Sequence, residues 1–158
     1  MIPDSPILET LHRHQVPFVV IGGLALIEHG YVRTTEDTDI VFLRGPEAET
    51  ALLAALRELD AHWLANETDP ATGMPRANPV TAAYVRTCRL MMLTTTAGFL
   101  DIFDFLPSLP DEPVASLFHD SVERDGVRFA SREWLIRLKR ASGRPRDLDD
   151  LSHLENTP

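Results

Sequence analysis

The stretch VIGGLALIEHGYVRTTEDTDIVF, residues 20–42, decides the expected fold. It reads as the end of an apolar strand, a Gly-Gly turn, a short helix, a polar loop and a second strand. Asp37 and Asp39 are two residues apart at the start of the second strand, so their side chains point to the same side. Two carboxylates beside a glycine turn at a helix start predict a site for a divalent metal ion and a phosphate.

The composition is that of one globular domain. A chain of 158 residues, with 44% hydrophobic and 25% charged residues, is long enough for one domain with a buried core. No apolar run approaches the roughly 20 residues of a membrane span, and the first residues, MIPDSPILETL, do not have the pattern of a signal peptide. We therefore expect a cytoplasmic protein without membrane contact. Cys88 is the single cysteine, which excludes an intramolecular disulfide and a zinc site built from several cysteines.

Charge is distributed unevenly along the chain. The net charge of −9 argues against nucleic-acid binding over the whole surface. Basic residues nevertheless crowd a C-terminal stretch in which Glu133 is the one acid before Asp147. The basic residues of this stretch are Arg132, Arg137, Lys139, Arg140, Arg144 and Arg146. The stretch predicts a local anion site within an acidic protein.

Hydrophobic periodicity predicts both helices and strands along the chain. The expected class is α+β, in which a mixed sheet is flanked by helices with a short C-terminal helical segment. The helices outside the opening stretch are expected at residues 6–14, 47–59, 114–119 and 132–142, with a last one from residue 145. Ser131 is expected to cap the helix that follows it, and Gly143 to end that helix. We expect a single domain over residues 1–158, with a core sheet in residues 1–110 and a C-terminal hairpin and helices in residues 111–158.

Turn-forming residues separate the expected strands. Residues 18–21 are a short apolar run that suits a buried strand. Residues 65–79 are rich in turn formers and have no period, which predicts a surface loop that could lie over the site. Residues 82–93 and 99–106 predict a β-hairpin, and Asp125-Gly126 marks the turn of a smaller one.

Two further candidate residues follow from the sequence. Asp101 and Asp104 lie in the second strand of the larger hairpin, and because they are three residues apart they face opposite sides. At most one of them should join Asp37 and Asp39. Lys139 is the only lysine among the 15 basic residues, so either the protein needs a compact ammonium there or chance placed it in its most basic helix.

These motifs together resemble a known family. A strand ending in Gly22-Gly23, thirteen intervening residues and then Asp37-Thr38-Asp39 resemble the signature of the nucleotidyltransferase superfamily with the DNA polymerase β-like fold. The segments GGLALIEHG, RTTEDTDIVF, GFLDIF and LIRLKRASGRPRDLDDL look like the bacterial minimal nucleotidyltransferases related to abortive-infection toxins of the AbiEii type. Thr38 departs from the family pattern, which usually has an aliphatic residue between the aspartates.

The resemblance implies a role for each matching residue. The implied metal ligands are Asp37, Asp39 and Asp101, with Asp104 as the fallback for the third carboxylate. The implied nucleotide contacts are Gly22, Gly23, Arg33, Thr35, Lys139 and Arg144. Lys139 would contact the triphosphate, whereas Arg33 could touch phosphate or balance neighbouring acids. Arg144, Asp147 and Asp150 match the family's end motif, yet a helix start at which Asp pairs with Arg explains them equally well.

The expected function is Mg²⁺-dependent transfer of a nucleoside monophosphate from an NTP, with catalytic Asp37, Asp39, Asp101 and Lys139 in a two-metal site. The acceptor of a related enzyme is a tRNA end, a protein or a small molecule. The expected biological role is the toxin of a toxin–antitoxin pair, with a cognate antitoxin or regulator as partner. The alternative is a non-catalytic module of the same fold that binds a nucleotide or a partner protein.

Overall fold

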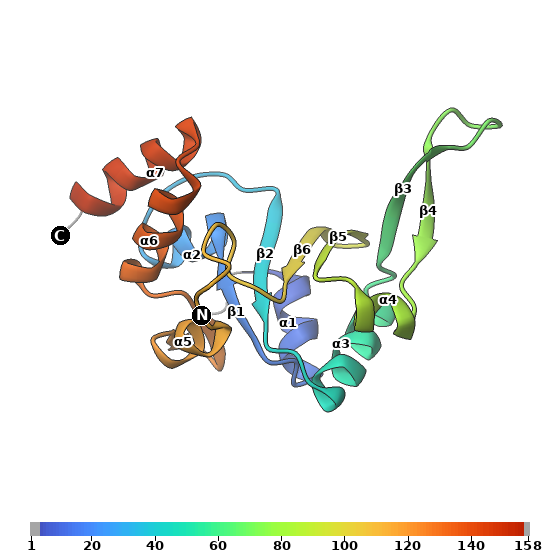
Figure 1. Cartoon of the computed structure of the whole chain (residues 1–158), viewed down its shortest axis with the longest axis horizontal. Helices are drawn as coiled ribbons and strands as arrows, with labels where there is room; N and C mark the ends of the chain where they lie inside the picture. Colours follow the sequence, from blue (N-terminus) through green and yellow to red (C-terminus); the bar gives the residue numbers. More distant parts are fainter. Residues whose placement is uncertain (1–3, 157–158) are drawn as a thin grey trace.

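The computed structural model describes residues 4–156, and its centre is an eight-stranded mixed β-sheet flanked by helices (Figure 1). The predicted α+β class is therefore confirmed. The strand order is β4-β3-β5-β6-β2-β1-β8-β7. The strands are β1 Phe18–Ile21, β2 Asp37–Phe42, β3 His62–Thr68, β4 Pro75–Pro79, β5 Leu90–Thr95, β6 Gly98–Phe103, β7 Val122–Arg124 and β8 Val127–Phe129.

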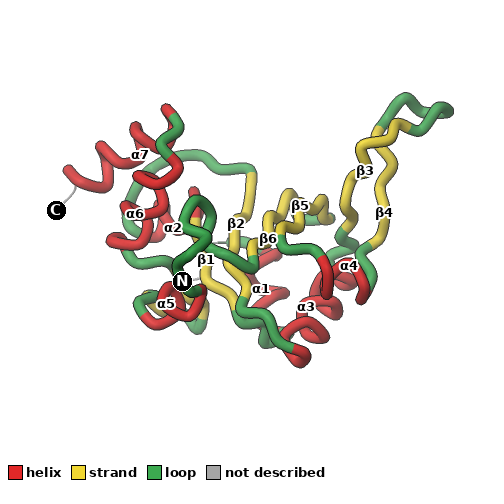
Figure 2. The backbone as a smooth tube through the Cα atoms, viewed as in Figure 1, coloured by secondary structure: helices red, strands yellow, loops and turns green. Residues whose placement is uncertain are grey.

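Seven helices surround the sheet within residues 4–156. They are α1 Pro6–Arg13, α2 Gly22–Glu28, α3 Pro46–Glu58, α4 Ala82–Thr87, α5 Val114–His119, α6 Arg132–Ser142 and α7 Pro145–Asn156. Helices α1 and α3 contact each other and supply fully buried leucines to the core, among them Leu8 and Leu52. Figure 2 shows α6 and α7 close to α2, at the end of the molecule opposite the β3–β4 hairpin.

The register of the central strands positions the predicted carboxylates. Strand β2 is antiparallel to β1 and parallel to β6. In this register Asp39 pairs with Ile21, the last residue of β1, and with Asp101 on β6. The turn at Gly22 therefore begins beside Asp39, as expected from residues 20–42.

The two faces of β2 and β6 differ in chemistry. Ile40 and Ile102 pair in register and are fully buried. Asp39 and Asp101 precede them by one residue, so they point to the opposite face. The buried face anchors both strands in the hydrophobic core, and the other face carries the carboxylates.

The helix termini follow the local signals in the sequence. The Ser131 hydroxyl accepts a 3.3 Å hydrogen bond from the Trp134 amide at the start of α6. Gly143 ends α6 in the left-handed conformation, with φ of 63°. A residue with a side chain is strained at this φ, so glycine is the favoured stop. Both predictions at α6 are confirmed.

The predicted surface loop at residues 65–79 is wrong outside residues 69–74, which connect two strands. These residues belong to the antiparallel hairpin of β3 and β4, and the turn formers make its tip, where the Asp69 amide donates to the Met74 carbonyl at 2.8 Å. The hairpin lies at the sheet edge, with β5 and β6 between it and β2. It projects away from β2 and β6, the strands that carry the predicted carboxylates (Figure 1).

The expected strand at residues 82–93 is wrong in its first half. Residues Ala82–Thr87 form α4, because Thr81 caps a helix start by accepting a 3.2 Å hydrogen bond from the Tyr84 amide. Strand β5 begins only at Leu90 and then pairs with β6 as expected.

Asp104 holds together the chain around the far end of β2. Its carboxylate accepts hydrogen bonds from Arg44 at 2.9 Å and from Arg89 at 3.0 Å. Arg44 also donates to Glu49 at 2.9 Å and to the Cys88 carbonyl at 2.8 Å, so it links β2, α3 and the segment before β5. Asp104 is thus engaged in a structural ion-pair network.

Replacing Arg44 with alanine is expected to lower the free energy of unfolding by about 2–3 kcal/mol, because it leaves the mostly buried Asp104 without one of its cations. Urea denaturation followed by circular dichroism measures the change. The matched control is Arg13→Ala, which breaks an exposed pair with Glu58 and should leave the midpoint nearly unchanged. Equal losses in the two variants would contradict the network.

Candidate active site

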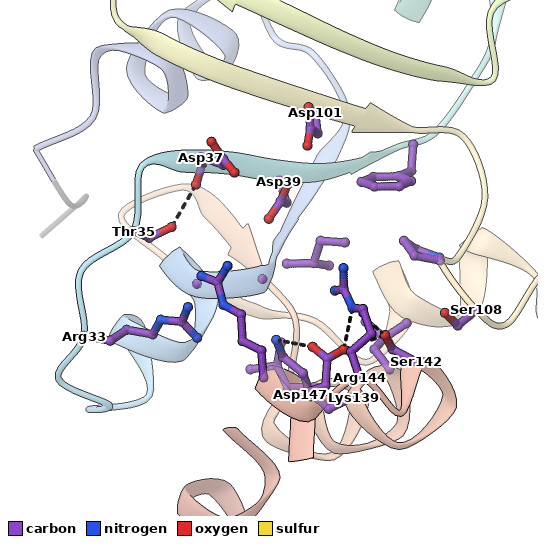
Figure 3. A pocket seen from close by; sticks show the side chains of 18 residues that line it. Arg33, Thr35, Asp37, Asp39, Asp101, Ser108, Lys139, Ser142, Arg144 and Asp147 are labelled. Carbon is purple, nitrogen blue, oxygen red and sulfur yellow. Dashed lines mark hydrogen bonds and ion pairs between the residues drawn. The ribbon is translucent and has the colours of Figure 1, made fainter. Parts of the chain in front are cut away.

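Three carboxylates gather on one face of the sheet where β2 and β6 meet (Figure 3). Asp39 pairs in register with Asp101, and Asp37 pairs with Phe99 two residues earlier on the same face. All three line one pocket of about 530 Å³. Of the two candidates for the third position, Asp101 lies in this pocket, and Asp104 is held by Arg44 and Arg89 elsewhere.

The crowding of these carboxylates changes their acidity. Burial, together with the charges of Asp101 and Asp37, raises the pKa of Asp39 to about 6, and Lys139 opposes this shift. Burial and the charge of Asp37 also raise the pKa of Asp101. Negative charge on this face is therefore unfavourable at neutral pH, and a cation bound among the carboxylates would relieve it.

The Gly-Gly turn packs directly against the site. Gly22 has φ of 69°, and a Cβ atom on it would collide with the carboxylate of Asp39. A Cβ atom on Gly23 would lie 2.7 Å from the Thr35 hydroxyl oxygen. Only glycine fits both positions without displacing these side chains. The start of α2 has no side-chain cap, so its first amides are left for other acceptors.

Basic side chains line the other side of the pocket. Arg33, from the loop before β2, and Lys139 and Arg144, from α6 and the turn after it, lie across from the carboxylates in Figure 3. Arg146, in the first turn of α7, lines the same pocket. The pocket therefore has an acidic wall on β2 and β6 and a basic wall on the C-terminal helices.

Two buried carboxylates of α7 hold the basic wall in place. The Lys139 ammonium donates to Asp147 at 3.1 Å and to Asp150 at 2.8 Å. Arg33 donates to Asp150 at 2.7 Å, and Arg144 donates to Asp147 at 2.7 Å. The side chains of Asp147 and Asp150 are only 1% and 3% exposed. Despite the opposing effect of burial, hydrogen bonds from Arg144, Ser142 and Lys139 lower the pKa of Asp147.

The structure brings most residues that the sequence suggested for the site into the lining of one pocket, whereas Asp104 and Asp150 do not line it. Lys139 lines the pocket, but its ammonium already contacts Asp147 and Asp150. Thr35 also lines the pocket, and its hydroxyl donates to the Asp37 carbonyl at 3.1 Å. Asp147 pairs with Arg144 at the start of α7, as the helix-start explanation expects, and both residues line the pocket.

The other arginines of the basic C-terminal stretch are bonded elsewhere. Arg137 forms an ion pair with Glu112, and Arg140 forms one with Glu155. Arg132 donates to a main-chain carbonyl near the end of α7. Fewer basic residues of this stretch are thus available for an anion site than its composition suggested.

Apolar residues in the lining of the pocket were missed by sequence reasoning. Phe103, Pro107, Leu135 and Leu138 line it, together with Ser108. Phe103 follows Asp101 by two residues on β6, so strand alternation alone could have placed it on the same face. The contribution of the Pro107–Ser108 loop depends on a tertiary contact that has no local sequence signal.

The carboxylates suit a hard divalent cation by their chemistry. Their side chains share one face of the sheet, and carboxylate oxygens are the ligands that hard divalent cations prefer. Within residues 4–156, however, no group of three or more His, Cys, Asp or Glu side chains is arranged to hold a metal ion. Coordination by Asp37, Asp39 and Asp101 together therefore requires their side chains to turn toward a common point.

Comparison with known proteins assigns the chain to no family. No protein-family model matches the sequence, and no curated protein is similar to it. Among solved structures, the crystal structure of JHP933 from Helicobacter pylori is similar, with a TM-score of 0.48 and 18% sequence identity. The alignment covers 94% of this chain, which spans 62% of the JHP933 chain. No helix within residues 4–156 has the length and apolar character to cross a membrane.

Replacing Asp39 with asparagine is expected to stabilise the protein in a pH-dependent way. Its folded pKa of about 6 exceeds the ordinary value of 3.8, so the folded chain retains a proton that the unfolded chain loses between these pH values. Stability therefore falls as the pH rises from 4 to 6. Without divalent cations, Asp39→Asn should gain on the order of 1–2 kcal/mol at pH 7.5 and nothing near pH 4.

Urea denaturation in EDTA at the two pH values measures this difference. The exposed Asp111→Asn serves as a control and should show no such pH dependence. A loss of stability in Asp39→Asn at pH 7.5 would contradict the repulsion described above.

Replacing Asp147 with asparagine is expected to lower the free energy of unfolding by about 3 kcal/mol, because Lys139 and Arg144 lose a buried anionic partner. Thermal and urea denaturation measure the loss. Asp149→Asn, on the exposed side of the same helix, should change stability by less than about 0.5 kcal/mol. Similar effects of the two substitutions would show that the buried contacts of Asp147 contribute little.

Proposed function

We propose that the protein is a nucleotidyltransferase, which transfers a nucleoside monophosphate from an NTP to a hydroxyl or phosphate acceptor. The observation that carries the proposal is the opposition of an acidic and a basic wall across one pocket, with the Gly22-Gly23 turn beside Asp39. A polyphosphate and its cation need this combination, since the cation binds carboxylates and the phosphates bind basic groups and main-chain amides. The sequence resemblance supports the same function.

Basic, apolar and acidic side chains of the pocket would bind different parts of the nucleotide and its cation. Arg33, Arg144 and Arg146 would contact the phosphates, and Phe103 with the other apolar lining residues would hold the base or sugar. Asp37, Asp39 and Asp101 would hold Mg²⁺, which when bound neutralises phosphate charge. The chemistry would take place between the two walls.

The reaction would be an in-line displacement at the α-phosphorus. The acceptor oxygen forms a bond to phosphorus, the bond to the β-phosphate oxygen breaks, and pyrophosphate leaves with the electron pair. A carboxylate of the site, Asp101 by its position, would take the acceptor proton. Lys139 would stabilise charge on the phosphates, and Asp147 and Asp150 would fix its position before substrate binds.

A non-catalytic, nucleotide-binding module is the second candidate. The observations that favour it are the occupied ammonium of Lys139 and the absence, in the described part of the chain, of three carboxylates arranged around one metal position. Such a module would bind nucleotide without releasing pyrophosphate. We propose the toxin of a toxin–antitoxin pair as the biological role of the enzyme, and an antitoxin-like subunit as that of the module; both rest on the sequence resemblance.

The proposed enzymatic activity is tested by incubating the purified protein with Mg²⁺, each of the four α-labelled NTPs and total tRNA. Release of pyrophosphate or label in an acceptor is expected, and Asp39→Ala should lower the rate at least about 100-fold because a metal ligand is lost. Omission of Mg²⁺ with EDTA should abolish transfer.

The exposed Asp111→Ala is the matched control and should keep the wild-type rate. Binding of an NTP analogue with a non-hydrolysable α–β bond, followed by calorimetry, separates the two candidates. Binding without any pyrophosphate release from the four NTPs would favour the module. Absence of both binding and turnover would refute both candidates.

A further inference from the structure

An exposed row of apolar side chains lies on the same sheet face as the carboxylates. Leu90, Met92 and Phe99, from β5 and β6, are 41%, 63% and 51% exposed, and we call them the apolar strip. Leu64 on β3, 48% exposed, extends it toward the sheet edge. Large apolar side chains gathered on an open face, with methionine among them, are characteristic of surfaces that bind another molecule.

The apolar strip directly adjoins the candidate reacting groups. Met92 pairs in register with Asp101, and Phe99 pairs with Asp37, so each is the cross-strand neighbour of a site carboxylate. Paired residues share a face of the sheet. The basic wall lies on α6 and α7, toward β2, while the strip continues from the carboxylates toward β5 and β3. The carboxylates therefore lie between the nucleotide pocket and the strip.

The surroundings of the strip carry little positive charge. Arg89, at the start of β5, is held by Asp104 and stacks over the Phe105 ring at 5.2 Å. Outside the site carboxylates, Glu36 borders the strip, and it is exposed and forms no ion pair within residues 4–156. The Glu36 main chain lies beside Gly98, at the turn that leads into Phe99.

This distribution of charge discriminates between classes of acceptor. A nucleic acid needs lysines and arginines along the path of its phosphates, and none of the strip residues is basic. A base could stack on Phe99, but its backbone would then run past carboxylates. An extended polypeptide with apolar and basic side chains matches both the strip and its acidic border.

We propose that the apolar strip is the docking surface for a polypeptide acceptor, an inference that rests on the nucleotidyltransferase function proposed above. Apolar side chains of the acceptor pack on Met92 and Phe99, and basic side chains flank them. A Ser, Thr or Tyr hydroxyl then reaches the carboxylates from the strip side. Its oxygen forms the bond to the α-phosphorus, its proton passes through Asp101 to solvent, and pyrophosphate leaves with the electron pair of the broken bond.

The test uses two defined acceptor pools with Mg²⁺ and the four α-labelled NTPs. One pool is a set of peptides in which Ser, Thr or Tyr is flanked by leucine and lysine, with a matched set in which glycine replaces leucine. The other is an RNA pool with free 3′-hydroxyl ends. We expect label on the leucine-containing peptides, at a rate at least tenfold above that on the glycine set.

Substitutions on the strip give the second readout. Met92→Gln and Phe99→Gln, both at exposed positions, should raise the KM for the peptide at least tenfold while affinity for a non-hydrolysable NTP analogue stays unchanged. Leu43→Gln is the matched control, because Leu43 is 41% exposed and lies at the opposite end of β2 from Asp37. It should alter peptide labelling less than twofold.

The outcomes separate this inference from the function on which it rests. Label in RNA but not in peptides would overturn the polypeptide acceptor and leave nucleotidyl transfer standing. Equal labelling of both peptide sets, or an unchanged KM in Met92→Gln, would overturn docking on the strip. No nucleotide binding and no label in any acceptor would overturn the proposed function itself.

Discussion

Asp39 and Asp101 lie side by side because β2 and β6 run parallel and in register. The same register places Ile40 beside Ile102 in the core, so hydrophobic burial on one face holds like charges together on the other. The resulting repulsion is opposed by the packing beneath it and by Lys139. A site that costs stability in this way and yet has a close-fitting glycine turn beside it is typical of binding and catalytic centres.

Much of the fold could be read from local patterns. The strand predicted at residues 18–21 is observed as β1 with the same bounds, and α6 has the predicted Ser131 cap and Gly143 stop. These features depend on residues a few positions apart, whose propensities and caps act within one element. The errors fell where two local signals competed. The turn formers within residues 65–79 predicted a loop where the chain forms a hairpin. Thr81 caps a helix, α4, where a strand was expected.

The site was predictable in part for the same reason. The neighbouring positions of Gly22, Gly23 and the two aspartates follow from one continuous stretch of sequence. The choice between Asp101 and Asp104 depended on which residue pairs with Asp39 across a parallel contact, and no local pattern specifies that register. The burial of Asp150 beside Lys139 and Arg33 could not be predicted either. The bond between Arg33 and Asp150 joins the loop before β2 to a helix more than a hundred residues later.

The bond between Arg33 and Asp150, across 117 positions of the chain, also bears on when the pocket can form. A ribosome makes β1, α2 and β2 long before α7, and nascent domains acquire structure from the N-terminal side first. Until α7 emerges, Arg33 and Lys139 lack their buried partners, and the acidic wall faces no ordered basic wall. The growing chain therefore has no complete pocket before α7, and whatever activity the pocket supports begins only after α7 has been synthesised.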